Sequence, residues 1–312
     1  MDTEPYVDHN PQIAGVLVFV TSFLGIIANG IVVFWVCSLP SMQTSFGRMT
    51  RSQATADFLH DWSFFLYMAP MLTFNLKSWN SHDVSSICGH LLLIFYDACN
   101  ACHFFMALNR TCAIFFPIQY PHIFSHRNVT IMNTFCWLSA IVPSIWTYRI
   151  ADCRFYYLDA IWGYTFDDNP LCGKIGWYYD FIKSVTTILI IGVLDLVTFI
   201  KCRIHGAQLV AKITDAQARA KRRSEIHYAT QVCLQGCIFI LELFSFFLFV
   251  NYVDSKMAKF ALTTIAWISV HALDGMITIY FNKEFRAIIR RKRDISATHS
   301  VGQKATHSSS QN

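Results

Sequence analysis

The sequence predicts an all-α membrane protein: a bundle of seven transmembrane helices followed by a short amphipathic helix. Hydrophobic residues make up 54% of the chain and charged residues only 14%. A soluble domain could have this composition only if its apolar residues were dispersed along the chain. They instead form long blocks, each able to cross about 30 Å of hydrocarbon at about 1.5 Å per residue. The predicted helices lie within residues 13–38, 51–75, 91–108, 128–148, 184–200, 226–253 and 260–282.

The second block, residues 51–75, is the least apolar of the seven. It contains Asp57, His60 and Asp61, followed by an apolar run over residues 62–74. Burying a charge in lipid costs about 3 kcal/mol or more and usually marks function. The acids inside the blocks are therefore expected to face the interior of the bundle. Further buried acids lie at Asp195, Glu242 and Asp274.

The distribution of lysine and arginine predicts how the chain is oriented, because cytoplasmic loops accumulate these residues. With the N-terminus outside, 18 of the 25 basic residues lie on the inner side and 7 on the outer side. The protein is thus expected to be a multi-pass membrane protein with its N-terminus outside. Residues 1–12 form a short extracellular segment without the basic start of a cleaved signal peptide, so the first helix is expected to act as its own signal.

The transmembrane domain is expected to span residues 13–282 and to be followed by an amphipathic helix over residues 283–293. In that helix Phe285, Ile288 and Ile289 share one face, while basic residues crowd the remainder. This spacing is typical of a helix that lies on the inner leaflet of a lipid bilayer. Residues 294–312 are expected to form a disordered cytoplasmic tail.

Three cysteines, Cys88, Cys153 and Cys172, face the oxidising outer side, so at most one disulfide forms among them. Cys88 precedes Arg110 by 22 residues, or about 33 Å of helix. Cys88 is therefore expected at the outer end of the third helix and Arg110 at its inner end. The other eight cysteines lack the paired short spacing of metal ligands. No metal ligand set is expected from this pattern.

Two phrases resemble the rhodopsin-like receptors. Residues 109–120, Asn-Arg-Thr-Cys-Ala-Ile-Phe-Phe-Pro-Ile-Gln-Tyr, resemble the cytoplasmic end of that family's third helix, with Asn109 and Thr111 replacing the outer residues of Asp-Arg-Tyr. Residues 274–286 resemble the end of its seventh helix, with Asp274 for Asn, Gly275 for Pro and Thr278 for Tyr.

Several phrases in a fixed order are similar to the nematode serpentine chemoreceptors of class X, over about residues 15–293. They are Asn-Arg and Ala-Ile-Phe-Phe-Pro at residues 109–110 and 113–117, Cys-Arg-Phe-Tyr-Tyr at 153–157, Cys-Leu-Gln-Gly at 233–236, Ser-Val-His-Ala-Leu-Asp-Gly at 269–275 and Phe-Asn-Lys-Glu-Phe-Arg at 281–286. The resemblance implies a G-protein-coupled chemosensory receptor for a small ligand. It also implies the plasma membrane, in sensory neuron cilia, as the location.

The resemblance assigns roles to particular residues. In rhodopsin-like receptors a disulfide ties the third helix to the second outer loop, which favours a Cys88–Cys172 bond here. A Cys153–Cys172 bond is the alternative. Arg110 is expected to lie where the inner crevice opens, and Glu225 below the sixth helix is expected to hold it in the resting state. The expected contacts of a heterotrimeric G protein are Arg110, Pro117, Tyr120, Arg222, Arg223 and Glu225.

Counting from the cytoplasmic ends puts Asn29, Asp57 and Asp274 at one depth. Asn29 lies nine residues before Ser38, Asp57 nine residues after Arg48 and Asp274 nine residues before Lys283, so each is about 13.5 Å into the membrane. Asn100, ten residues before Arg110, comes within about 2 Å of that level. Two carboxylates in low dielectric must share a proton or hold a cation, for which sodium is the candidate. These four residues are expected to form a polar switch network, against the alternative of a plain hydrogen-bonded packing cluster.

A second tier lies about 18–20 Å above the cytoplasmic ends and is expected to line the ligand pocket. Its aromatic members alone would more often be packing residues, and the acids carry the case for ligand contact. The predicted pocket residues are Asp61, Tyr96, Asp97, Trp267 and His271.

The expected mechanism is a population shift in which an outer-side ligand favours a conformation with helices five and six swung away from Arg110. No enzyme activity is expected, because the histidines lack a metal-ligand spacing and no serine lies in a nucleophile elbow. No nucleic-acid partner is expected. The alternative is a proton-linked transporter or channel that uses the same carboxylates. Against it stand the absence of an inverted repeat and the phrase around Arg110.

Overall fold

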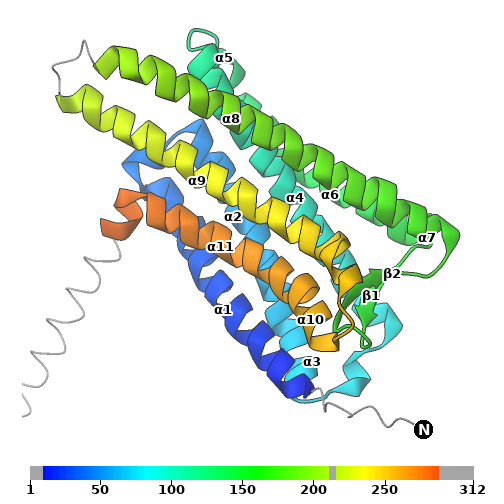
Figure 1. The fold of residues 1–312 in the computed structure, drawn as a ribbon. Coiled ribbons are helices and arrows are strands. Elements are labelled where there is room, and N and C mark those ends of the chain that lie inside the picture. The colour runs from blue at the N-terminus through cyan, green and yellow to red at the C-terminus, as the bar shows by residue number, and fades with distance from the viewer. Residues whose placement is uncertain (1–9, 211–215, 288–312) are drawn as a thin grey trace, which may run out of the picture.

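The structure, a computed structural model, describes residues 10–210 and 216–287, including their side chains except at Lys77, Arg203, 205–229 and 232–233. Over these residues the chain forms seven helical rods and one β-hairpin (Figure 1). The predicted seven-helix bundle is therefore confirmed. Residues 283–287 begin the expected eighth helix. The remainder of that helix, residues 1–9 and the predicted tail over residues 294–312 lie outside the described residues.

Three of the rods contain a π-helical turn. In chain order the rods are α1 (Pro11–Trp35); α2 (Ser45–Ser63), a π-turn (Phe64–Met68) and α3 (Ala69–Thr73); α4 (His82–Phe115); α6 (His126–Arg149); α7 (Pro170–Lys174), a π-turn (Ile175–Ile182) and α8 (Lys183–Val210); α9 (Ala216–Phe247); and α10 (Lys256–Phe260), a π-turn (Ala261–Ile265) and α11 (Ala266–Phe281). The short helix α5 (Tyr120–Ile123) lies between α4 and α6, and 3-10 turns occupy Val36–Ser38, Pro40–Met42, Lys77–Trp79 and Phe249–Tyr252.

Helix starts and stops follow from local sequence. Asn10, Ser81 and Ser125 cap α1, α4 and α6, and each side-chain oxygen accepts a hydrogen bond from a backbone N–H of the first turn. α4 ends at Phe115, two residues before Pro117, because proline cannot continue a helix and restricts the residue before it.

Within the described residues, five segments are long and apolar enough to cross a membrane: Pro11–Ser38, His82–Phe115, His126–Arg149, Pro170–Cys202 and Lys256–Phe281. α2 is more polar, and its buried face carries Asp57, His60 and Asp61. In α9 the apolar stretch is the shorter Leu234–Phe247. These two rods complete the bundle because described polar side chains of both, such as Asp57 and Asp61 of α2 and Gln235 and Glu242 of α9, are buried among the other helices rather than exposed to lipid.

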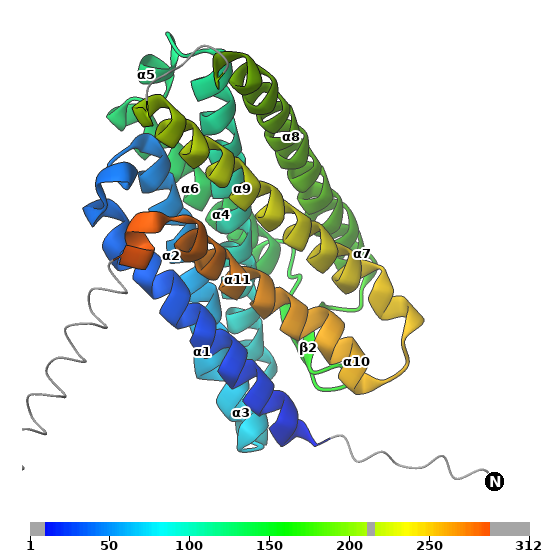
Figure 2. The same ribbon diagram turned by 60° about the vertical axis from the view of Figure 1, so that its left-hand side comes forward.

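Helix α4 lies at the centre of the bundle. It packs against α2, α6 and α8, and β1 (Phe155–Leu158) lies against its N-terminal part. This end of the bundle is the one predicted to face the outside and is called the outer end, and the opposite end is called the inner end. α11 packs between α1 and α9, as Figure 2 shows. Since lipid is as apolar as the helix surfaces that face it, the polar residues collect in the interior that α2, α4 and α11 share.

A hairpin covers the outer end of the bundle. β1 pairs antiparallel with β2 (Gly163–Phe166), with Phe155 opposite Phe166. Ser85 Oγ of α4 accepts a hydrogen bond from Tyr157 N at 2.8 Å, and Thr264 Oγ1 donates to Trp162 O at 2.8 Å. Burial raises the pKa of the Tyr157 phenol. The hairpin is thus fastened to two rods and closes the bundle from the outer side.

The disulfide of the outer side joins Cys153 to Cys172, with their Cα atoms 5.4 Å apart, and Cys88 is free. The expected Cys88–Cys172 pair is therefore wrong, and the alternative with Cys153 is the one formed. The reason is packing. Cys88 lies against the main core, whereas Cys153 and Cys172 share a separate small cluster with Ile175.

The contact between α4 and the hairpin yields a stability prediction. A Cβ added at Gly89 would collide with the Phe155 carbonyl oxygen, whereas a Cβ added at Gly192 of α8 would meet open space. Gly89→Ala is expected to destabilise the protein by about 1–3 kcal/mol. Gly192→Ala is expected to be neutral or stabilising, by up to about 1 kcal/mol. Thermal unfolding of the two purified variants checks this, and equal melting temperatures would contradict the close approach.

Candidate functional site

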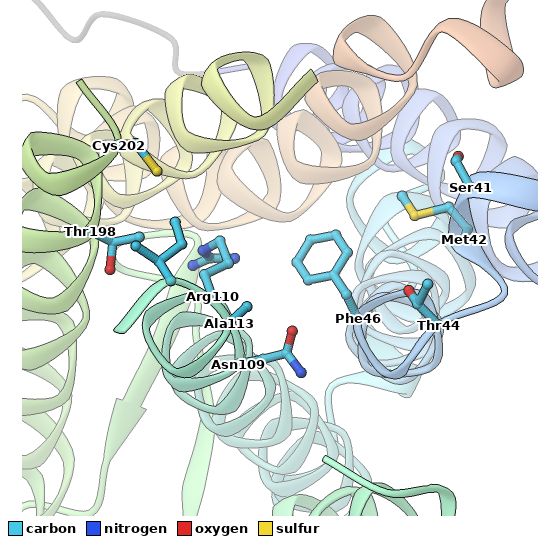
Figure 3. Close-up of a pocket in the computed structure, with 10 residues that line it drawn as sticks. Ser41, Met42, Thr44, Phe46, Asn109, Arg110, Ala113, Thr198 and Cys202 are labelled. Carbon is cyan, nitrogen blue, oxygen red and sulfur yellow. The ribbon is translucent and has the colours of Figure 1, made fainter. Parts of the chain in front are cut away.

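A cavity of about 260 Å³ opens at the inner end of the bundle, around Arg110. Figure 3 shows Arg110 and Ala113 of α4 between the α8 residues Thr198 and Cys202 on one side and Phe46 of α2 on the other. The residues that line it are Ser41, Met42, Thr44, Phe46, Asn109, Arg110, Ala113, Ile114, Thr198 and Cys202.

Arg110 is tied to Asp195 of α8. Its Nη2 donates to Asp195 Oδ1 at 2.7 Å and its Nε donates to the same oxygen at 3.2 Å. The two side chains are only 11% and 6% exposed, so solvent screens the pair little. Thr111 adds a second link at 2.9 Å to Thr198 of the same helix. Arg110 Nη1 has no hydrogen-bond partner within the described part of the chain.

Within the described residues, the carboxylate that holds Arg110 is Asp195, and the predicted partner Glu225 stays a prediction. The side chains of Arg222, Arg223 and Glu225 in α9 lie outside the described residues. The sequence contained the signal for Asp195, because it is the lone acid in an apolar block.

Two other predicted coupling residues lie beside the same end of α4. The Tyr120 hydroxyl donates to Asn109 Oδ1 at 3.4 Å and lies 3.1 Å from Ser45 Oγ of α2. Pro117 is exposed in the turn that follows α4. The structure therefore brings Arg110 and Tyr120 to one inner face and puts Pro117 at its edge.

A polar network crosses the interior where α2, α4 and α11 meet. His271 Nδ1 lies 2.7 Å from Asp57 Oδ1, and His103 Nε2 lies 2.6 Å from Asp274 Oδ2. Gln53 donates to both carboxylates, at 2.9 Å for Asp274. Asp57, His271 and Asp274 are at most 1% exposed. Each acid therefore has its own imidazole partner.

The predicted network is partly rearranged. Asn29 does not join Asp57 and Asp274 directly: its Nδ2 donates to Asp61 Oδ2 at 3.2 Å and to the His271 carbonyl at 3.0 Å. Gly275 permits this approach, because a Cβ there would collide with Asn29. Asn100 is not bonded into the network, and its buried Nδ2 has no partner among the described residues.

Two residues expected in the ligand pocket, Asp61 and His271, belong to the polar network instead. Both are fully buried and bonded to Asn29 and Asp57 as described above. Gln53 and His103 were not singled out by the sequence analysis. The available signal was helical spacing, since Gln53 lies four residues before Asp57 and His103 four after Cys99, which puts each pair on one helix face.

The remaining predicted pocket residues lie nearer the outer side. Lys183 Nζ lies 2.6 Å from each carboxylate oxygen of Asp97 and 4.5 Å from the Tyr179 ring centroid. The rings of Tyr96 and Trp267 meet edge to face at 5.9 Å. A small cavity of about 20 Å³ lies beside Asp97 and Tyr179. Lys183, one of the seven basic residues counted on the outer side, is the counter-ion of Asp97 that sequence reasoning missed.

Unpartnered polar atoms mark the same region. The Tyr96 hydroxyl, Glu242 Oε2 and Ser184 Oγ are buried without a hydrogen-bond partner within the described residues. These side chains come from α4, α9 and α8 respectively. Buried polar groups are normally paired, and an unpaired one is a place where a ligand or water can bind.

Comparison with known proteins is consistent with this geometry. Residues 19–282 match the family model described as "Serpentine type 7TM GPCR chemoreceptor Srx". Serpentine receptor class X 45 of Caenorhabditis elegans is 33% identical over 304 residues, covering 91% of this chain and 82% of that protein. Serpentine receptor class X-43 of the same organism is 27% identical over 196 residues, covering 61% and 59% respectively.

Among solved structures, squid rhodopsin has a similar fold, with a TM-score of 0.73 and 19% identity over 93% of this chain and 82% of that chain. The bundle thus has the seven-helix fold of squid rhodopsin, and the family model that the chain matches is one of chemoreceptors and not of enzymes. The chain belongs to the serpentine class X family of seven-transmembrane G-protein-coupled chemoreceptors.

Proposed function

We propose that this receptor binds a small ligand from the outer side and activates a heterotrimeric G protein through the cavity around Arg110. The observation that carries the proposal is the Arg110–Asp195 pair, which joins α4 to α8 beside a cavity lined by residues of both helices. A conformation in which this pair separates would enlarge the cavity. A ligand that prefers that conformation shifts the population toward it.

The inner face offers suitable contacts for a G protein. Arg110 Nη1 is a buried donor without a partner within the described residues, and an ionised donor of this kind binds backbone carbonyls or carboxylates strongly. Beyond α4, Ile118 is 83% exposed and would supply an apolar contact. Arg222 and Arg223 would add positive charge from α9.

The ligand is proposed to bind near Tyr96, Asp97 and Trp267. The support is the Lys183–Asp97 pair and the unpartnered polar atoms of Tyr96 and Glu242. The hairpin covers this region from the outer side, so the ligand is expected to enter beside it or from the membrane.

The polar network of Asp57, Asp274 and their histidines is proposed to set the resting conformation. It ties α2 and α4 to α11 through side chains that lipid cannot solvate, so a helix movement must exchange one set of partners for another. The family assignment supports a location in the plasma membrane of sensory neuron cilia, with the N-terminus outside.

The proposed orientation predicts which terminus antibodies reach. An epitope fused before Met1 is expected to be labelled on intact cells, and one fused after Asn312 only after permeabilisation, because 18 of the 25 basic residues then lie inside. Labelling is measured by flow cytometry on cells that express each fusion. The reverse pattern would remove the basis for a G protein at the Arg110 cavity.

The Arg110–Asp195 pair predicts opposite effects for its two members. Arg110→Ala is expected to abolish signalling at normal surface levels, because the G-protein contact is lost. Asp195→Asn retains the shape but loses the charge that holds Arg110, so basal signalling is expected to rise by about fivefold or more. A calcium readout in cells, with a panel of odorants as ligands, measures both.

Two further variants make this test specific. Arg110→Ala alone leaves the buried Asp195 carboxylate unpaired, which could itself harm folding. The double variant Arg110→Ala with Asp195→Asn leaves no unpaired charge and is expected to stay silent at normal surface levels, which would assign the silence to lost coupling. Glu225→Gln is expected to leave basal signalling unchanged. Elevated basal signalling in Glu225→Gln together with wild-type behaviour of Asp195→Asn would assign the restraint to Glu225.

A further inference from the structure

The thiol of Cys99 lies between two Asp–His pairs in the middle of the bundle. Its sulfur is close to donor atoms of Asp57 and His271 on one side and of His103 and Asp274 on the other. Within each of these triads all donor atoms lie within 4.8 Å of one another. Cys99 also hydrogen-bonds to Asp57. One sulfur, two imidazoles and two carboxylates thus converge from three helices, α2, α4 and α11.

The kind of donor decides which cation fits. Sodium prefers oxygen ligands, and this cluster offers oxygen from only two of its five side chains. A thiolate with imidazole and carboxylate is the ligand set of Zn²⁺, which binds four such groups tetrahedrally at about 2.0–2.3 Å. Ligands at those bond lengths are about 3.3–3.7 Å apart. Small side-chain rotations would bring donors that now lie within 4.8 Å to that spacing.

The surroundings also suit a metal centre. Asp57, Cys99 and His271 are fully buried, and His103 and Asp274 are 5% and 1% exposed, so water would compete little for the ion. Gln53 donates to both carboxylates, which orients them as outer-shell partners do in metal sites. His271 Nε2 is buried without a partner within the described residues. The centroid of the His271 ring lies 3.8 Å from that of the His60 ring. The imidazole of His60 is therefore the neighbouring ring when His271 turns.

We propose that this cluster binds one Zn²⁺ ion, with Cys99 as the shared ligand and three further ligands drawn from Asp57, His271, His103 and Asp274. On binding, the thiol proton is released to solvent, together with any proton held on the carboxylate oxygens and imidazole nitrogens that become ligands, while each ligating imidazole keeps the proton on its other nitrogen. The metal then replaces hydrogen bonds by coordinate bonds among the same helices. It fastens α4 to α2 and α11.

A consequence follows that rests on the proposed function. A zinc ion that bridges α2, α4 and α11 stabilises the arrangement in which these helices are packed as they are here. Zinc is therefore expected to lower basal signalling and to reduce agonist potency, as a ligand of the resting state does. The metal site itself does not depend on this consequence.

The test measures metal directly. The receptor is purified from zinc-supplemented cells, desalted, and analysed by mass spectrometry for zinc per protein, with about one ion expected. Cys99→Ser is expected to weaken zinc binding by about tenfold or more. Cys102→Ser is the matched control, since Cys102 is equally buried, lies on the same helix and belongs to neither triad.

Two readouts keep the test independent of signalling. Cobalt(II) in place of zinc should give a thiolate charge-transfer band that Cys99→Ser abolishes and Cys102→Ser retains. Zinc should also raise the melting temperature of the wild type, as a ligand that binds only the folded state does, and this needs no variant to fold. A zinc-free wild type whose melting temperature responds to sodium but not zinc would overturn the proposal. So would a folded Cys99→Ser variant that retains the metal. Zinc binding that leaves basal signalling and agonist potency unchanged would count against the proposed function alone.

Discussion

The interior of this bundle depends on pairing buried acids with basic side chains from other helices, with Asp61, bonded to Asn29, and Glu242, whose Oε2 has no partner among the described residues, as the exceptions. A carboxylate in hydrocarbon costs several kcal/mol unless a partner compensates it, and breaking such a pair is costlier still, at about 3–5 kcal/mol. Four pairs meet this need within the described residues: Asp97 with Lys183, Asp57 with His271, Asp274 with His103, and Asp195 with Arg110. Because each pair joins two helices, the charges also determine which helices lie side by side.

Helix α4 connects these pairs along the membrane normal. It contributes Asp97, His103 and Arg110, which are six and seven residues apart, or about 9 and 10 Å. Its outer and inner members bind the same partner helix, α8, and its middle member binds α11. A ligand that disturbs the outer pair would therefore act on a helix that is also held at its inner end. This arrangement gives a physical route from a ligand near Asp97 to the cavity around Arg110.

Sequence reasoning predicted the depths of these residues but not their partners. Apolar block lengths gave seven helices, and Arg110 was expected at the inner end of the third, where the cavity lies. Counting residues from a boundary measures position along a helix and says nothing of rotation about its axis. Asp61 and His271 were therefore assigned to a ligand tier, whereas they turn toward Asn29 and Asp57. Likewise Lys183 was counted only as a charge of the outer side, whereas the structure has it in the helical rod formed by α7, the π-turn and α8, paired with Asp97 of α4.

The central claim is that the Arg110–Asp195 pair holds the inner ends of α4 and α8 together in the resting receptor. The most direct measurement is the distance between spin labels at Ile118→Cys and Ile204→Cys, two exposed positions beside these ends. The protein is studied in nanodiscs, and the exposed cysteines Cys37 and Cys237 are first replaced so that only the two chosen positions are labelled. Double electron–electron resonance is expected to show one short distance in the wild type and an added longer population when Asp195 is changed to Asn. Superimposable distance distributions would contradict the account.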